Sequence, residues 1–317
     1  MLNRQEQILA IVITTCTNRK RKPVASRLHA GDLKKGGITQ VAAEWGERLG
    51  EAYQTYPASS LYGGRSFRDS MVAAEKVGAE LLIVSAGLGL VSARTQVPSY
   101  ACTVLSGAAD SIAAPITEGF SRANWWKELG QVSPHTMKLA DVADCRTGLI
   151  MAALSDGYIE MMLEEFLTLP EGRRGDLRLF TRTPRERIPA QLQPYLMPYD
   201  DRLDGPDSPI RGTRSDFAAR ALLHFVESIL SSNDDRSASQ HADAVERAAK
   251  DWAEPPVFSR RRLSDDEIRQ LMRRHWLETN GSTTKLLRLF RDELDIACEQ
   301  GRFASLAREI RSEVSHG

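Results

Sequence analysis

Three short apolar runs, each followed at once by small polar residues, constrain this chain most. They are residues 8–13, 81–84 and 149–154, and the polar stretches after them are residues 14–20, 85–90 and 155–158. Short, continuous runs of this kind are typical of strands buried on both faces of a parallel sheet. Because the carboxyl ends of such strands meet at the edge where ligands bind, we predict one pocket built from three strand ends.

Between and after these runs, apolar residues recur at helical spacing. This pattern predicts helices over residues 39–53, 68–77, 157–167 and 215–230, a helical insertion over residues 109–144, and a fourth strand over residues 177–181. Alternation of strand and helix predicts an α/β fold with a mostly parallel sheet flanked by helices.

A polar stretch at residues 231–235 is the best domain boundary in the sequence. We therefore predict an α/β pocket domain over residues 1–231, a polar linker and helix over residues 232–258, and a small all-α module over residues 259–317. The module should hold three helices, the first opened by a capping box from Ser264 to Glu267, and is compatible with a helix-turn-helix fold. Lys and Arg outnumber Asp and Glu by only two over residues 260–314, so DNA binding and protein contacts through these helices stay open as alternatives.

Charge is informative only locally, because Lys plus Arg and Asp plus Glu both total 42. Residues 17–37 carry seven Lys and Arg against one Asp, which is typical of a solvated loop but is also suited to a flap that grips an anion. The cations expected to contact nucleic acid are Arg19, Lys20, Arg21, Lys22 and Arg65.

Several classes of protein are disfavoured by absent signals. The sequence has no signal-peptide pattern and no apolar run near the ~18 residues that span a bilayer, so we expect a cytoplasmic protein with no membrane partner. None of the four cysteines forms a C-x-x-C pair, and no histidine has metal-ligand spacing, so neither zinc nor a disulfide scaffold is expected. The glycine-rich segment at residues 85–90 lacks the G-x-G-x-x-G spacing, and no cofactor is predicted.

Cys16 is the candidate nucleophile, because cations beside it in the sequence would stabilise a thiolate. Ser85 and Ser155, at the ends of the other two strands, could supply donors to a developing anion, and the three residues form the predicted catalytic set. The alternative for Cys16 is a packed structural thiol, and for Asp156 a favourable charge at a helix N-terminus. The predicted substrate-binding residues are Asn18, Tyr62, Gly87, Gly89, Tyr100, Asp156 and Tyr158.

Three ordered motifs resemble those of the YaaA-like group and its uncharacterised bacterial relatives. They are the cysteine-lysine segment at residues 16–20, the Leu-Tyr-Gly-Gly segment at residues 61–68, and the Ser-Ala-Gly-Leu-Gly-Leu segment at residues 85–90 followed by Pro98 and Tyr100. The matching positions are Cys16, Lys20, Tyr62, Ser85, Gly89, Pro98 and Tyr100.

The resemblance implies a fold related to uracil-DNA glycosylases and association with DNA. In some relatives it implies membership of 7-deazaguanine DNA-modification systems, in which a related protein hydrates a cyano group on a base. We therefore expect a protein that recognises or modifies a nucleobase, such as a 7-deazaguanine-type base in DNA, in a modification or phage-defence context. The alternative is a non-catalytic DNA-binding or complex-assembly protein of a stress-response or defence system.

Overall fold

The computed structural model describes residues 10–232, 234–256 and 259–315. It divides into two compact units, Met1–Pro255 and Pro256–Gly317, each with its own hydrophobic core. Ile8 and Leu9 of the first predicted strand, and Asn233, Val257 and Phe258 of the predicted linker region, lie outside the described residues. Within the part of the chain that is described, no helix is both long and apolar enough to cross a membrane.

A five-stranded sheet forms the centre of the first unit, in the order β5-β4-β1-β8-β9. Its strands are β1 (Ile11–Thr15), β4 (Glu80–Ser85), β5 (Gly89–Ser92), β8 (Ile150–Ala153) and β9 (Leu177–Phe180). All neighbouring pairs are parallel except β4 and β5, which form an antiparallel hairpin at one edge. The predicted α/β class with a mostly parallel sheet is therefore confirmed.

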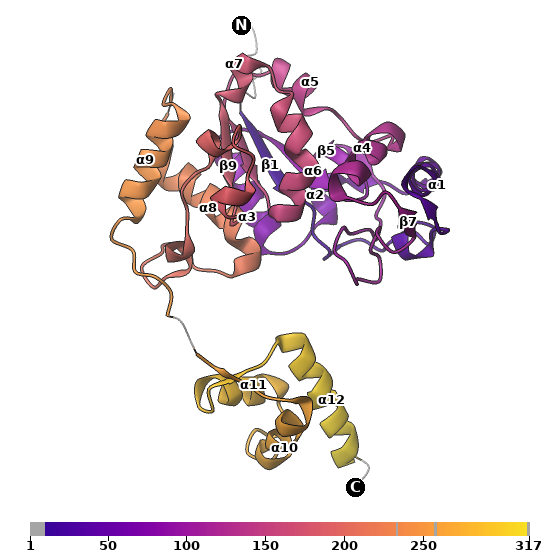
Figure 1. Ribbon diagram of the computed structural model, residues 1–317, viewed down its shortest axis with the longest axis vertical. Coiled ribbons are helices and arrows are strands. Elements are labelled where there is room, and N and C mark those ends of the chain that lie inside the picture. The colour runs from indigo at the N-terminus through magenta and orange to yellow at the C-terminus, as the bar shows by residue number, and fades with distance from the viewer. Residues whose placement is uncertain (1–9, 233, 257–258, 316–317) are drawn as a thin grey trace, which may run out of the picture. The chain divides into compact units, whose positions relative to one another are not determined.

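The sheet changes direction between β1 and β8. From β1 the chain passes through α3 (Arg65–Lys76) to β4 on one side, whereas from β8 it passes through α6 (Asp156–Leu167) to β9 on the other. Because such crossovers are right-handed, α3 and α6 cover opposite faces of the sheet (Figure 1). The carboxyl ends of β1 and β8 therefore flank the topological switch point, where open α/β sheets bind ligands.

Helices cover both faces of the sheet. On one face α3 packs with α8 (Phe217–His224), and on the other α6 packs on α4 (Arg122–Val132), which packs on α1 (Ile38–Gly50). The remaining helices of this unit are α2 (Ala58–Leu61), α5 (Leu139–Asp144), α7 (Glu171–Arg174) and α9 (Ala238–Ala249), with a π-helical turn Phe225–Ile229 after α8. Two short strand pairs join β2 (Gly36–Gly37) to β7 (Ile116–Glu118) and β3 (Tyr56–Pro57) to β6 (Gln96–Val97).

Helix α1 shows how the apolar pattern selects these elements. Val41, Trp45 and Leu49 recur every four residues, lie on one face and are buried, whereas Ala43 and Glu47 on the opposite side are exposed. The predicted helical insertion at residues 109–144 is only partly helical. It contains turns and β7 before α4 and α5, and its tryptophans, Trp125 and Trp126, are both buried.

Helix α9 belongs to the first unit, although the sequence places residues 232–258 in a linker and connecting helix. Arg178 of β9 is buried and donates hydrogen bonds from Nε to Nδ1 of His241, 2.9 Å away, and from Nη2 to the carbonyl of Arg236. Nε2 of His241 in turn lies 3.1 Å from a carboxylate oxygen of Asp234. These buried contacts, which polarity alone does not reveal, attach α9 to the sheet and place the division of the chain after Pro255.

The second unit is a small helical module with its own core. Its helices are α10 (Asp265–His275), α11 (Thr283–Asp292) and α12 (Gln300–Ser315), and a parallel two-stranded pair joins β10 (Arg261–Arg262) to β11 (Ile296–Ala297). The capping box from Ser264 to Glu267 opens α10 as the sequence predicts. Ile268, Met272, Phe290 and Phe303 are among its fully buried side chains.

Candidate functional site

The loops after β1 and β8 meet at the switch point. Cys16 follows β1, is 6% exposed, and its sulfur lies 3.1 Å from the hydroxyl of Tyr158 in the first turn of α6. A hydroxyl at this distance can donate a hydrogen bond to a thiolate or accept one from a thiol. The predicted meeting of two strand ends thus produces one direct contact between candidate residues.

Three further candidates form a buried chain of hydroxyl groups. The Oγ of Ser85 lies 2.5 Å from the Tyr100 hydroxyl, which lies 3.0 Å from the Tyr62 hydroxyl. Ser85 Oγ also accepts hydrogen bonds from the backbone N–H groups of Gly87 and Leu88, at 3.3 and 3.0 Å. Since these bonds use both lone pairs of Oγ, Ser85 is the donor to Tyr100, whereas either hydroxyl can donate in the Tyr100–Tyr62 bond.

The glycine-rich turn after β4 is a closed structural element. Trp45 donates to the carbonyl of Gly87 at 2.7 Å, Trp125 to that of Ala86 at 2.8 Å, and Ser133 to that of Leu88 at 2.7 Å. The N–H groups of Gly87 and Leu88 are bonded to Ser85 and are therefore not free to bind a phosphate or an oxyanion.

Two glycines in this turn are required by close packing. A Cβ at Gly87 would lie 2.6 Å from a ring carbon of Tyr100. Gly89 has φ of +85°, and a Cβ there would lie 2.2 Å from Oγ1 of Thr136. Both glycines permit the close approach of Tyr100 and Thr136, and their predicted role in binding substrate stays a prediction.

Lys20 lies at the centre of this cluster. Its ammonium donates a hydrogen bond to the carbonyl of Thr17 at 2.8 Å and lies 4.8 and 4.4 Å from the ring centroids of Tyr62 and Tyr100. Burial lowers the pKa of Lys20, and the neighbouring thiols of Cys16 and Cys102 oppose that shift. No carboxylate of the described residues lies within ion-pair distance of this ammonium, so aromatic faces and one carbonyl are its main partners.

Burial favours the neutral forms of three phenols and one thiol around Lys20. Burial raises the pKa of Tyr62, Tyr100 and Tyr158, and the nearby Cys16 raises it further. Burial also raises the pKa of Cys102, whose Sγ lies 3.5 Å from the carbonyl of Ala86.

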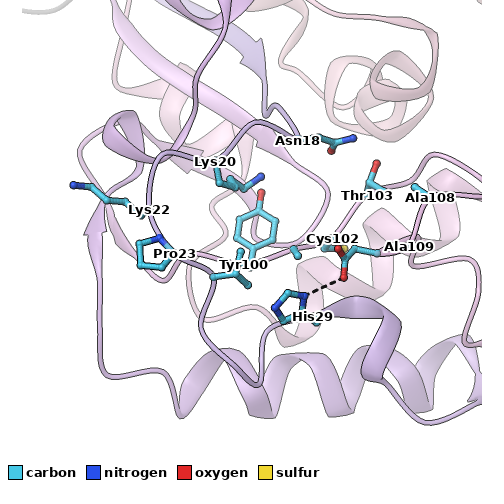
Figure 2. A pocket seen from close by; sticks show the side chains of 13 residues that line it. Asn18, Lys20, Lys22, Pro23, His29, Tyr100, Cys102, Thr103, Ala108 and Ala109 are labelled. Atoms are coloured by element: carbon cyan, nitrogen blue, oxygen red, sulfur yellow. Dashed lines mark hydrogen bonds and ion pairs between the residues drawn. The ribbon is translucent and has the colours of Figure 1, made fainter. Parts of the chain in front are cut away.

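A pocket of about 520 Å³ opens beside Lys20 and Tyr100 (Figure 2). Cys102, rather than Cys16, supplies the sulfur of its lining. At the pocket, Nδ1 of His29 lies 3.3 Å from a carboxylate oxygen of Asp110. The complete lining is Asn18, Lys20, Lys22, Pro23, Val24, His29, Tyr100, Ala101, Cys102, Thr103, Ala108, Ala109 and Asp110.

The basic loop at this pocket is tied to the body of the unit. Backbone hydrogen bonds join Arg21 to Leu61 at 2.8 Å, Gly63 to Arg19 at 2.9 Å, and Ala101 to Leu28 at 2.8 Å. The exposed side chains of Arg19 and Arg21 and the partly buried Lys22, whose ammonium lies 5.1 Å from the Tyr56 ring centroid, therefore project from an anchored segment. Arg65, also predicted to bind nucleic acid, forms an ion pair with the buried Asp69 at 3.2 Å.

Two predicted site residues lie at the surface, away from the hydroxyl chain. Ser155 is the exposed N-cap of α6, and its side chain makes no capping hydrogen bond. Asp156 is exposed, accepts a hydrogen bond from Thr183, and forms an ion pair with Arg187 at 3.0 Å. The structure therefore gathers Cys16, Lys20, Tyr62, Ser85, Tyr100 and Tyr158, and leaves Ser155 and Asp156 outside this group.

Sequence reasoning did not select four residues that shape the site. Cys102 and Thr103 line the pocket and follow Tyr100 closely in the chain. The signal in the sequence that could have indicated Cys102 was its position two residues after Tyr100. Asp110 and Trp45 reach the site through folding of distant segments and had no local signal. Among the described residues, no group of His, Cys, Asp and Glu is arranged to hold a metal ion.

Comparisons of the chain with protein-family models, with curated proteins and with solved structures found no match. The resemblance to the YaaA-like group stays a prediction from the three motifs.

Proposed function

We propose that the strand-end pocket binds a nucleobase of nucleic acid, DNA in particular, and that the surrounding basic loop binds the flanking phosphates. The observation that carries the proposal is the pocket of about 520 Å³ beside the Lys20–Tyr100 pair. Ligand pockets usually have volumes of about 300–1,000 Å³, and a single nucleobase with part of its sugar fits this range.

The chemistry of the lining suits the edge of a base. Asn18 supplies both a donor and an acceptor, Thr103 supplies a hydroxyl, and the His29–Asp110 pair supplies a ring nitrogen and a carboxylate. Bases are read through donors and acceptors of this kind on their edges, with apolar surface against their faces. Alanine and proline side chains in the lining provide that apolar surface.

The charge around the pocket suits phosphates. Lys20 has no carboxylate partner among the described residues, and Arg19, Arg21 and Lys22 project from the same anchored segment. A partly desolvated ammonium attracts an anion more strongly than one in bulk water. Phosphates on either side of a bound base would therefore meet fixed cations.

For the reaction, we propose Cys16 as a nucleophile toward an electrophilic carbon on the base. On a nitrile, the sulfur would add to the carbon while the nitrogen takes a proton. Water would then add to the same carbon and expel the thiol, leaving an amide. Tyr158, 3.1 Å from the sulfur, is positioned to exchange the thiol proton.

The second candidate function is non-catalytic DNA binding or complex assembly. It is favoured by one observation, that Cys102 rather than Cys16 contributes the sulfur of the pocket lining. In this case the pocket would bind a base without changing it. In this second proposal, α10 and α11 form a helix-turn-helix arrangement that binds DNA.

Fluorescence anisotropy with a labelled DNA oligonucleotide tests the proposal. Replacing Arg19, Arg21 and Lys22 with Ala should weaken binding and reduce the slope of log affinity against log salt by roughly one unit per lost contact. Lys127→Ala with Lys250→Ala, which removes two exposed cations elsewhere on the unit, is the control. Equal slopes for the wild type and the triple variant would refute the phosphate contacts.

A further inference from the structure

A second cavity, of about 590 Å³, lies in the C-terminal unit and is lined almost entirely by polar side chains. Four of its residues are arginines, which come from three places: the β10 strand and the residue before it, the end of α11, and the first turn of α12. We call this the arginine groove; its lining is Arg260, Arg262, Arg291, Ala297, Cys298, Glu299 and Arg302.

Hydrogen bonds to the main chain hold three of these arginines in place. Arg291 donates to the carbonyl of Cys298 at 2.9 Å, Arg260 to that of Arg291 at 2.9 Å, and Arg302 to that of Leu263 at 3.0 Å. Each guanidinium carries five N–H donors in a rigid fork. A main-chain hydrogen bond to one N–H group restricts the whole arginine side chain. Less conformational entropy is therefore lost when the remaining N–H groups bind a ligand.

The carboxylates around the groove leave part of its positive charge uncompensated. Arg302 pairs with Asp265 at 2.6 Å, and Arg260 lies 3.7 Å from Asp292. Arg262 and Arg291 have no carboxylate within ion-pair distance in the described part of the chain.

Glu299, the acidic residue of the lining, is occupied by the start of α12. Its carboxylate accepts hydrogen bonds from the backbone N–H groups of Gly301 and Arg302, both at 2.7 Å. These bonds lower the pKa of Glu299. Its charge is thus compensated chiefly by the helix terminus, with a smaller contribution from Arg291, and Glu299 forms no ion pair with any arginine of the groove in the described unit.

We propose that the arginine groove binds the phosphate backbone of a nucleic-acid strand, as a site separate from the strand-end pocket. Guanidinium forks match phosphate oxygens two at a time, which explains why all four cations are arginines and none is lysine. The groove is several times larger than one phosphate, and charged side chains predominate in its lining, where Ala297 and Cys298 offer little apolar surface for the side chains of a phosphopeptide. Successive phosphates of one strand would satisfy the separated guanidiniums.

The test is DNA binding by the full-length chain, measured by anisotropy over a range of salt concentrations. Replacing Arg262 and Arg291 with Ala should weaken binding at least tenfold and reduce the salt slope by about two units, one for each lost phosphate contact. The control replaces Arg274 and Arg308, two exposed arginines of the same unit outside the groove, and should change affinity less than about threefold by the same reasoning.

Two further measurements keep the proposal falsifiable. Arg262→Ala alone removes an exposed side chain for which the described unit shows no hydrogen bond or ion pair, so it tests the groove even if the double variant unfolds. It should reduce the slope by about one unit. An unchanged slope in Arg262→Ala would overturn the proposal. The proposal would also be overturned if a serine phosphopeptide competed with DNA at equal phosphate concentration, because the groove would then be a phosphopeptide site.

Discussion

The hydroxyl of Tyr158 lies 3.1 Å from the sulfur of Cys16, although 142 positions separate the two residues in the chain. Cys16 follows β1 and Tyr158 begins α6 after β8, so their contact crosses the point where the sheet changes direction. The same cluster holds the Ser85–Tyr100–Tyr62 hydroxyl chain and the Lys20 ammonium, which lies over the Tyr62 and Tyr100 rings. A buried group of a thiol, three phenols and an amine is therefore a consequence of the strand order.

Cys16 should be the most reactive of the buried cysteines. Burial raises the pKa of Cys102 and Cys298, which keeps them as unreactive thiols at neutral pH. Cys145 is exposed and would react with iodoacetamide for that reason alone. The labelling is therefore done on the Cys145→Ser variant and followed by mass spectrometry. We expect Cys16 to be alkylated well before Cys102 and Cys298.

The contrary outcome identifies a structural thiol. If Cys16 is alkylated no faster than Cys102, and Cys16→Ser lowers the free energy of unfolding by about 1–3 kcal/mol, the side chain acts by packing. A catalytic role predicts instead that Cys16→Ser abolishes turnover of a nitrile-bearing base and leaves DNA affinity within about tenfold.

Gly87→Ala should destabilise the first unit by about 1–3 kcal/mol, because the new Cβ would overlap the Tyr100 ring and force it to move. Gly130→Ala is the matched control. Gly130 is an exposed helical position in α4 with nothing within 4 Å of an added Cβ, so that substitution should stabilise by about 0.4–1 kcal/mol. Thermal melting of both variants measures the difference, and equal melting temperatures would show that Tyr100 is loosely packed.

The protein should lose stability as the pH falls below about 6.5. Burial lowers the pKa of His135, His224 and His241 from a usual value of 6.5. Below that value the unfolded chain takes up protons that the folded chain does not, which favours unfolding. At higher pH both states are neutral at these positions, and the full stability is retained.

Substitution of one histidine isolates its share of this effect. Gln cannot be protonated in this range, so His241→Gln should reduce the fall in unfolding free energy between pH 7.5 and 5.5, as measured by urea denaturation. The same pH dependence in the variant and the wild type would show that the Arg178–His241 contact is not linked to protonation.

Sequence patterns were sufficient to predict the strands and to place Cys16 and Ser85 at strand ends, because both depend on local order. The runs at residues 8–13 and 81–84 are apolar throughout, and parallel strands bring their carboxyl ends to one edge. Burial of Lys20 against two tyrosine rings could not be predicted, since a lysine in a basic loop is usually solvated. The same holds for Trp45 and Asp110, whose contacts with the turn and with His29 arise from tertiary packing.

The most direct test of the nucleobase pocket is to fill its entrance. Ala109 lines the pocket and is exposed, so Ala109→Trp should block it without disturbing the core, whereas Ala114→Trp places the same bulk at an exposed position outside the lining. Anisotropy with a labelled single-stranded DNA should show at least tenfold weaker binding for Ala109→Trp and wild-type affinity for Ala114→Trp. Wild-type affinity in both variants would contradict the proposal that the pocket holds a base.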